Sequence, residues 1–185
     1  SEGAFWAYSS TYWKEIKHST LRKRIHKLDG TSYGGQKTLR ISSSFIDGVV
    51  REMAAMSDNP EFFEASGKGV NLLNGFVKIS TSGTVSLEPH SSDHRQRFMI
   101  AQEWQPSPYE IPDGFLQTLL FGSFGADDAE SHQLIMEILG ASITGINIGL
   151  PNPKAFVFYG PSAANGKSTI QAVIRRLLPS KVVAC

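Results

Sequence analysis

The sequence has little cysteine and no long apolar run, and each of these absences excludes a class of protein. The only cysteine among the 185 residues is Cys185, so these residues can form neither an intrachain disulfide nor a zinc site made of several cysteines. The longest weakly polar run, Ile138 to Leu150, has about thirteen residues, whereas an α-helix needs roughly 20 to cross a bilayer. The first residues lack the pattern of a secretion signal. We therefore expect a cytoplasmic protein with no membrane partner.

The sequence also lacks a strong excess of charge of either sign. Lysine and arginine number 18 against 17 aspartate and glutamate residues, which gives a formal net charge of +1. Any contact with nucleic acid would therefore depend on a local cluster of charge. One dense basic stretch exists, and it is either a DNA-binding surface or a solvated helix face; its cations are Lys14, Lys17, Arg22, Lys23, Arg24 and Lys27.

Local patterns in the first half of the chain predict a mixed α+β module. Aromatic stretches on either side of a serine-rich turn predict strands over residues 5–8 and 12–16. Helical spacing predicts a helix from Ser19 to about Gly30. A second helix is predicted from the Ser42–Ser44 run to Asn59, with an apolar stripe made of Phe45, Val49, Val50, Met53 and Met56.

The middle of the chain changes from helical to strand periodicity and back. The turn signals Asn74-Gly75 and Ser82-Gly83 separate short β-branched runs, which predicts a small β meander over residues 70–87. After a proline-rich connection, apolar residues at helical spacing predict helices over residues 115–120 and 134–139.

The most informative feature is an apolar run, a turn and an amphipathic helix near the end of the chain. The continuous apolar run over residues 155–159 predicts a buried parallel strand. Gly-Lys-Ser-Thr occupies residues 166–169, and the apolar residues that follow recur at the spacing of one helix face. Unpaired backbone N–H groups and the positive dipole end of a helix favour an anion at such a turn. The pattern therefore predicts a phosphate-binding loop.

Each residue type of this turn suits a role in binding ATP and Mg²⁺. Lys167 is expected to reach the β- and γ-phosphates, Ser168 to offer a hydroxyl to Mg²⁺, and Gly166 to keep a Cβ away from the phosphates. Five residues separate Gly160 from Gly166, one more than the usual four. Either the loop bulges by one residue, or Pro161 stands at the place of the first glycine. A plain strand–turn–helix without a ligand is the alternative.

With this turn in place, the chain resembles the superfamily 3 helicase region of phage- and plasmid-type primase–helicases, a family similar to the primase–helicases of satellite phages and poxviruses. The asparagine before Gly-Lys-Ser-Thr is typical of that family. The resemblance covers nearly the whole chain. The segments that carry it are Phe5-Trp6, Trp13-Lys14, Asn74-Gly75, Leu87-Glu88-Pro89-His90, Phe115-Leu116, Glu137-Ile138-Leu139-Gly140, Phe158-Tyr159-Gly160 and Asn165-Gly166-Lys167-Ser168-Thr169.

The resemblance implies two domains. An α+β accessory domain over residues 1–153, made of the small β meander and helices, would precede the first β-strand, P-loop and helix of an AAA+-like α/β ATPase over residues 154–185. The implied ATP site comprises Gly160, Asn165, Gly166, Lys167, Ser168 and Thr169. Among them Lys167 would be catalytic and Ser168 would hold Mg²⁺ through its hydroxyl.

The resemblance also implies partners and a reaction. The protein would couple ATP hydrolysis to unwinding at a replication fork in phage or mobile-element DNA. It would bind single-stranded DNA and assemble as a ring of identical chains, often a hexamer, in the host cytoplasm if the source is viral.

The acidic residues of such an ATPase are missing from the expected place. Residues 168–185 contain no aspartate or glutamate, and Asp127-Asp128 precede the turn rather than follow an apolar strand. We therefore expect a truncated ATPase domain, a fragment of a longer helicase that alone does not hydrolyse ATP. One alternative is a non-enzymatic DNA-binding or oligomerisation module of a replication protein. A weaker alternative is a small-molecule P-loop kinase.

Two further groups of side chains carry weaker predictions. The first group lies in one loop and has the chemistry of metal ligands but no evident geometry, so a metal site is not expected at Glu88, His90, Asp93 and His94. The second group either anchors a core, which is the expected role, or stacks on nucleic-acid bases; it comprises Trp6, Trp13, Phe62 and Phe63.

Overall fold

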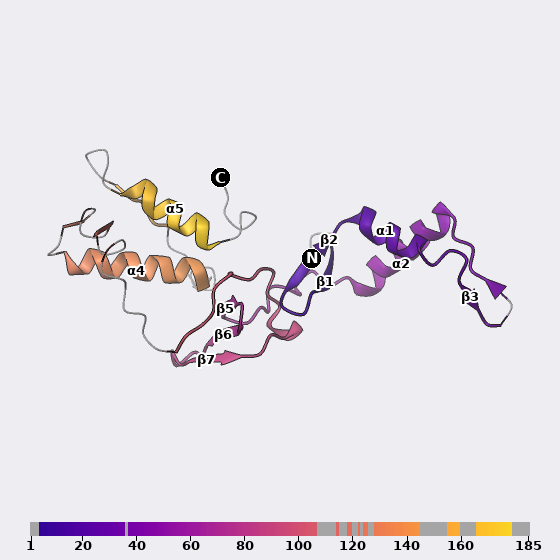
Figure 1. The fold of residues 1–185 in the computed structure, drawn as a ribbon, viewed down its shortest axis with the longest axis horizontal. Coiled ribbons are helices and arrows are strands. Elements are labelled where there is room, and N and C mark those ends of the chain that lie inside the picture. The colour runs from indigo at the N-terminus through magenta and orange to yellow at the C-terminus, as the bar shows by residue number, and fades with distance from the viewer. Residues whose placement is uncertain are drawn as a thin grey trace. The chain divides into compact units, whose positions relative to one another are not determined.

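The computed structural model describes residues 4–35, 37–106, 114, 118–119, 122, 124–125, 128–144, 155–159 and 166–178. The chain is a mixed α+β protein with small antiparallel sheets and helices, which Figure 1 shows in their order along the chain. It divides into two compact units. Unit 1 comprises residues 1–66 and 91–97, and unit 2 comprises residues 67–90 and 98–185.

Unit 1 begins with an aromatic hairpin. Strands β1 (Phe5–Tyr8) and β2 (Trp13–Ile16) pair antiparallel, so that Phe5 lies opposite Ile16 and Tyr8 opposite Trp13. The turn between them is closed by a 2.9 Å hydrogen bond from the Ser9 N–H to the Tyr12 carbonyl. This hairpin confirms the two strands predicted at the start of the chain.

Two helices form the core of unit 1. The helix α1 (His18–His26) begins one residue before the predicted Ser19, without a side-chain cap. The helix α2 (Ser43–Ser57) begins as predicted, and the hydroxyl of Ser42 accepts the N–H of Phe45. A short hairpin of β3 (Ser32–Tyr33) and β4 (Lys37–Thr38) lies between them in the sequence. The buried residues of both helices form one cluster of Leu21, Ile25, Ile46 and Val50.

The predicted apolar stripe of α2 is partly wrong. Val50 is buried as predicted, but its buried companion is Ile46, and the predicted Phe45, Met53 and Met56 are exposed. The reason is that α1 offers only two buried apolar residues one helical turn apart. These two residues of α1 bury Ile46 and Val50 of α2. The apolar side chains farther around α2 remain exposed within unit 1.

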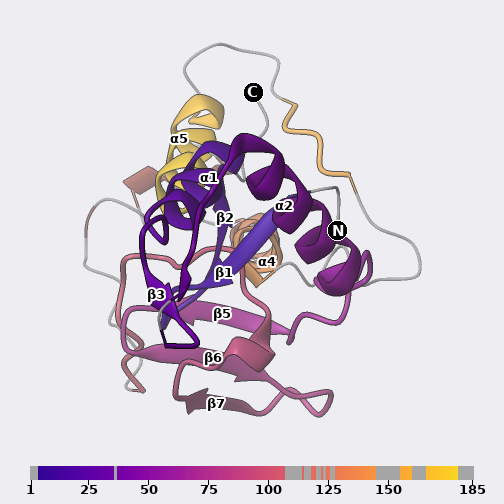
Figure 2. The same cartoon turned by 90° about the vertical axis from the view of Figure 1, so that its right-hand side faces the viewer.

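The centre of unit 2 is a three-stranded antiparallel meander, which confirms the prediction for this region. Its strands are β5 (Gly69–Leu72), β6 (Gly75–Ile79) and β7 (Val85–Glu88), and Figure 2 shows β6 between the other two. Leu72 of β5 also bridges to Ile100, so the chain after residue 98 follows the free side of β5.

A buried amide fixes the loops around the meander. Asn71 is 2% exposed, and its side-chain N–H donates to the carbonyl of Phe98 at 3.1 Å. Its Oδ1 lies 3.0 Å from Nδ1 of His90, and Nε2 of His90 lies 3.3 Å from the carbonyl of Leu73. Because a buried polar group without partners is costly, these contacts hold the segments on both sides of β5 in register.

Two helices complete the described part of unit 2. The helices α4 (Ala129–Thr144) and α5 (Lys167–Leu177) lie side by side (Figure 1). At the start of α4, Asp128 accepts the N–H of Ser131 at 3.0 Å. Hydrogen bonds from the hydroxyl and the N–H of Ser131 hold the pKa of Asp128 below its ordinary value. The carboxylate is therefore favoured where the helix dipole is positive.

Several predictions for the second half of the chain concern residues that the structure does not describe. Three of them lie outside the described residues: most of the predicted helix over residues 115–120, the residue Asp127, and the predicted domain boundary between residues 153 and 154. Within the described part of the chain, no helix combines the length and apolar composition needed to cross a membrane.

The prediction of a strand over residues 155–159 is wrong. These residues are described, and they take part in no β-pairing with any described strand. The reason is physical: an apolar run becomes a strand only when a neighbouring strand accepts and donates its backbone hydrogen bonds. The observed fold is therefore the mixed α+β arrangement with small antiparallel sheets.

The surroundings of two glycines of unit 2, one in the meander and one in α4, predict opposite effects of substitution by alanine. A Cβ on Gly69 would lie 2.1 Å from the carbonyl oxygen of Val77, so Gly69→Ala should lower the free energy of unfolding by about 1–3 kcal/mol. A Cβ on Gly140, inside α4, would meet no atom within 4 Å, so Gly140→Ala should raise it by roughly 0.5–1 kcal/mol. Urea denaturation followed by circular dichroism measures both changes. Equal midpoints for the two variants would contradict the close approach of β5 and β6.

Candidate functional site

The helix α5 begins at the predicted phosphate-binding turn. Its N-terminal cap is Gly166, which has φ 76° and ψ −6°, and Lys167 is the first helical residue. Glycine adopts this left-handed conformation without steric cost because it has no Cβ. The carbonyl of Gly166 accepts the N–H of Ile170 at 2.9 Å, which closes the first turn of the helix. Gly166 therefore leads directly into the helix.

Buried apolar side chains hold α5 in place. Ile170 is only 3% exposed and forms a cluster with Ile135 and Ile138 of α4. At the other end of the helix, Leu178 packs into a second cluster with residues of the meander. Ile174 contacts both clusters. The buried side of α5 is thus the apolar face that the sequence predicts.

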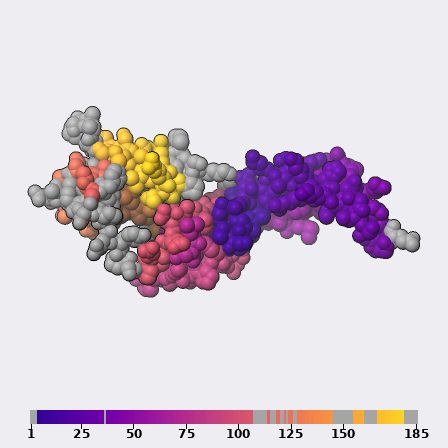
Figure 3. Space-filling model, viewed as in Figure 1, coloured from indigo at the N-terminus to yellow at the C-terminus, as the bar shows by residue number. Residues whose placement is uncertain are grey.

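The N-terminal end of α5 is positively charged. Its first turn contains no acidic residue, and Lys167 stands at the end where the helix dipole is already positive. Arg175 and Arg176 lie in the last turn, where cations are favoured. Figure 3 shows α5 at the molecular surface in this view. The N-terminal end of such a helix favours an anion.

A cavity of about 270 Å³ adjoins this end of the helix. Lys167 and Ile170 line it together with residues of α4 and the apolar run 155–159. In that run Phe158 packs into the cluster around Ile170, whereas Tyr159 is 87% exposed. The cavity therefore combines an apolar wall with a cationic edge. A ligand with an aromatic part and an anionic part suits such a lining.

The structure describes part of the predicted ATP site. Gly160 and Asn165 lie outside the described residues. The remaining predicted residues form the cap and first turn of α5, where Ser168 is exposed and the other three are half-buried; they are Gly166, Lys167, Ser168 and Thr169. Their assignment to phosphate and Mg²⁺ stays a prediction.

The residues weighed as metal ligands are not brought together. Glu88 pairs with Nζ of Lys78 at 3.0 Å, and His90 contacts the buried amide described above. Among the residues that the structure describes, no three His, Cys, Asp or Glu side chains are grouped closely enough to hold a metal ion.

Part of the basic stretch lies on the exposed side of α1 and at its C-terminal end. Lys23, Arg24 and Lys27 are exposed, while the opposite side of the helix packs on α2. Arg22 differs, because its guanidinium pairs with Asp47 of α2. Three cations on one exposed side are compatible with both interpretations, a solvated face and a phosphate-binding surface.

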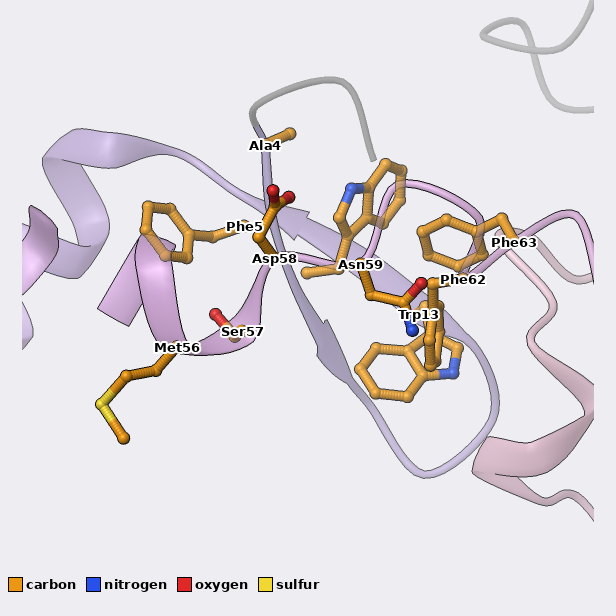
Figure 4. A pocket seen from close by; sticks show the side chains of 10 residues that line it. Ala4, Phe5, Trp13, Met56, Ser57, Asp58, Asn59, Phe62 and Phe63 are labelled. Atoms are coloured by element: carbon orange, nitrogen blue, oxygen red, sulfur yellow. The ribbon is translucent and has the colours of Figure 1, made fainter. Parts of the chain in front are cut away.

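A second cavity, of about 480 Å³, lies in unit 1 and has an aromatic lining (Figure 4). All four aromatic residues that the sequence weighed as core anchors or stacking platforms line it, and all are half-buried: Trp6, Trp13, Phe62 and Phe63. Arg95 lies over the ring of Phe62 at 4.7 Å, and Arg97 lies over Phe63 at 5.1 Å. Sequence reasoning missed both arginines, because no local pattern relates them to rings so distant in the chain.

Comparisons with known proteins add no family assignment. Neither a scan against protein-family models nor a search of curated proteins found a match for this chain. Inferences about function therefore depend on the geometry above and on the sequence pattern of the turn.

The packing of α5 predicts the effect of two neighbouring substitutions. Ile170→Ala should destabilise unit 2 by about 2–5 kcal/mol, because it leaves a cavity against α4. Gln171→Ala, at the exposed next position, should have little effect. Limited trypsin digestion checks this, since Lys167 and Arg175 in α5 become cleavable when the helix detaches. Equal cleavage rates in α5 for the two variants would contradict the packing.

Proposed function

We propose that the chain binds Mg²⁺–ATP at the start of α5 and is part of an ATP-dependent DNA helicase similar to phage- and plasmid-type primase–helicases. One observation carries the proposal: Gly166 takes a left-handed conformation immediately before Lys167, which begins a helix held by buried residues. A Gly-Lys-Ser-Thr turn needs this geometry to aim several backbone N–H groups at one phosphate.

In this proposal the first turn of α5 performs three tasks. Its backbone N–H groups donate hydrogen bonds to phosphate oxygens, and the ammonium of Lys167 neutralises charge on the β- and γ-phosphates. The hydroxyl of Ser168, which is exposed, is a ligand for the hard cation Mg²⁺. The apolar wall of the adjoining cavity accommodates part of the nucleoside.

The proposal assigns residues 154–185 to the beginning of an AAA+-like ATPase and residues 1–153 to an accessory domain. The exposed apolar side chains of Phe156, Val157 and Tyr159 support it, since an apolar surface of this kind is stabilised when a further part of such a domain covers it. A ring of identical chains on single-stranded DNA belongs to the same proposal and derives from the resemblance.

A second function is favoured by a different observation. The basic side of α1 and the aromatic cavity both lie in unit 1, so this unit could bind DNA without any nucleotide. In that case the chain is a non-enzymatic DNA-binding module. Gel-shift measurements separate the two functions, because a pure binding module gives the same DNA affinity with and without Mg²⁺–ATP.

Substitution of the lysine tests the ATP site. Lys167→Ala should weaken Mg²⁺–ATP binding by roughly 30- to 150-fold, because it removes charge-assisted hydrogen bonds worth about 2–3 kcal/mol. Lys68→Ala removes an exposed lysine from the same unit and should leave the affinity unchanged. Isothermal titration calorimetry on the whole chain measures both dissociation constants.

Two results would contradict the proposal. One is a wild-type chain that gives no heat with Mg²⁺–ATP, and the other is an equal loss of affinity in the two lysine variants. Phosphate release by the 185 residues should be negligible, because no carboxylate follows the turn in the sequence to position a water molecule. Measurable turnover would contradict this part of the proposal.

A further inference from the structure

We propose that the aromatic cavity of unit 1 binds an unpaired base of single-stranded DNA, and that Arg95 and Arg97 bind the neighbouring phosphates. The choice of DNA as the strand rests on the proposed function. The binding site itself does not, because it lies in unit 1 and uses no residue of the ATP site.

The rings that line the cavity also contact one another. Trp6 meets Phe63 edge to face with 4.9 Å between centroids, and Trp13 meets Phe62 in the same way at 5.0 Å. Such contacts fix the rings, yet all four remain half-buried around the cavity (Figure 4). Core anchoring explains the contacts between the rings. It does not explain the hollow that they line, whose volume suits a small planar ligand.

The last residue of α2 and the two residues after it supply polar groups at the same cavity. Ser57, Asp58 and Asn59 line it beside the rings (Figure 4). Hydroxyl, carboxylate and amide groups are the donors and acceptors that pair with base edges. Met56 also lines the cavity and is 86% exposed. A flexible thioether at the edge adapts to bases of different size, as a stacking site without sequence preference requires.

Arg95 is held in a strained conformation beside the rings. It is a non-glycine residue with φ 52°, in the left-handed region. Its guanidinium donates to the carbonyl of Phe62 at 2.9 Å, and its own carbonyl accepts the hydroxyl of Ser66 at 3.0 Å. Strain of this kind persists only where the surroundings enforce it, and it is frequent at binding sites. Here it keeps a cation over the ring of Phe62.

Arg97 places a second cation at the rings and remains exposed. Its guanidinium lies 5.1 Å from the centroid of Phe63 and 5.9 Å from that of Trp6. Two guanidinium groups over the rings disfavour a cationic ligand by charge repulsion and favour one that carries phosphate. A nucleotide strand offers both a planar base for the aromatic rings and a negative charge for the arginines, since each base is linked to an anionic phosphate.

Charge on the rest of unit 1 extends the site. Phe5 lines the cavity, and its ring lies 5.7 Å from the ring of His18, the first residue of α1. The sequence from Lys14 to Arg40 contains eight lysine and arginine residues and two acidic residues. A strand whose base stacks in the cavity therefore meets further cations along α1, which complements its phosphates.

Fluorescence anisotropy without nucleotide tests the site with the whole chain. The probe is a labelled oligothymidine of roughly 15 nucleotides. Trp6→Leu should weaken its binding about tenfold or more, whereas Trp6→Phe, which keeps a ring, should restore most of the affinity. Trp104→Leu is the control tryptophan, because Trp104 belongs to unit 2, and it should leave binding unchanged.

The arginine and the bases are tested separately. Arg97→Gln should lower the slope of log K against log salt by about 0.7, the value for one contact with a single strand, and the exposed Arg51→Gln should not. An abasic strand of the same length should bind wild type more weakly than oligothymidine does. Trp6→Leu should then cause no further loss, because no base remains to stack.

Each other outcome overturns the inference. Equal affinities of Trp6→Leu and Trp6→Phe, or equal binding of abasic and ordinary strands, exclude base stacking in this cavity. If Trp6→Leu does not fold by circular dichroism, Phe63→Leu and Phe63→Tyr take its place. Oligouridine that binds more tightly than oligothymidine overturns the choice of DNA. Lys167→Ala should bind the probe as wild type does, so failure of the ATP site and failure of this site are distinguishable.

Discussion

The burial of Ile170 against α4 decides where the positive end of α5 lies. Ile170 is one helical turn from Gly166, whose carbonyl it contacts through its own N–H, so fixing this side chain also fixes the turn. A phosphate site made of backbone N–H groups has no long side chains that could adapt to a shifted ligand. Its precision therefore depends on the rigidity of the helix that carries it. The second apolar cluster, at Leu178, prevents the other end of the helix from pivoting.

The two proposed sites depend on different physics. The start of α5 presents backbone dipoles and the ammonium of Lys167, and its geometry follows from helix packing. The aromatic cavity depends on side chains alone, with rings that offer stacking surfaces and with Arg95 and Arg97 as cations. Stacking is tolerant of sequence, whereas the phosphate contacts make strand binding sensitive to salt. An ATPase that moves along DNA needs both properties: a nucleotide site with precise geometry, and a strand site that binds DNA whatever its base sequence.

Local features of the fold could be predicted from the sequence, and features that depend on distant partners could not. The aromatic hairpin and the meander follow from turn residues between short strands, and the position of Gly166 before a helix follows from the turn pattern. The apolar run over residues 155–159 fails as a strand because pairing depends on a neighbour that no local pattern specifies. Arg95 and Arg97 reach the rings only through tertiary structure. The left-handed turn at Arg95 gives no glycine signal in the sequence, since a non-glycine residue occupies it.

The segment that carries both arginines is continuous in the chain with the core that supports α5. Residues 91–97 belong to unit 1, but the chain on either side of them belongs to unit 2. Shortly after this segment, Ile100 bridges to Leu72 of β5 and shares one apolar cluster with Leu178 at the end of α5. The same short stretch of chain therefore serves both units, with Arg95 and Arg97 at the rings of unit 1 and Ile100, three residues later, in the apolar core of unit 2.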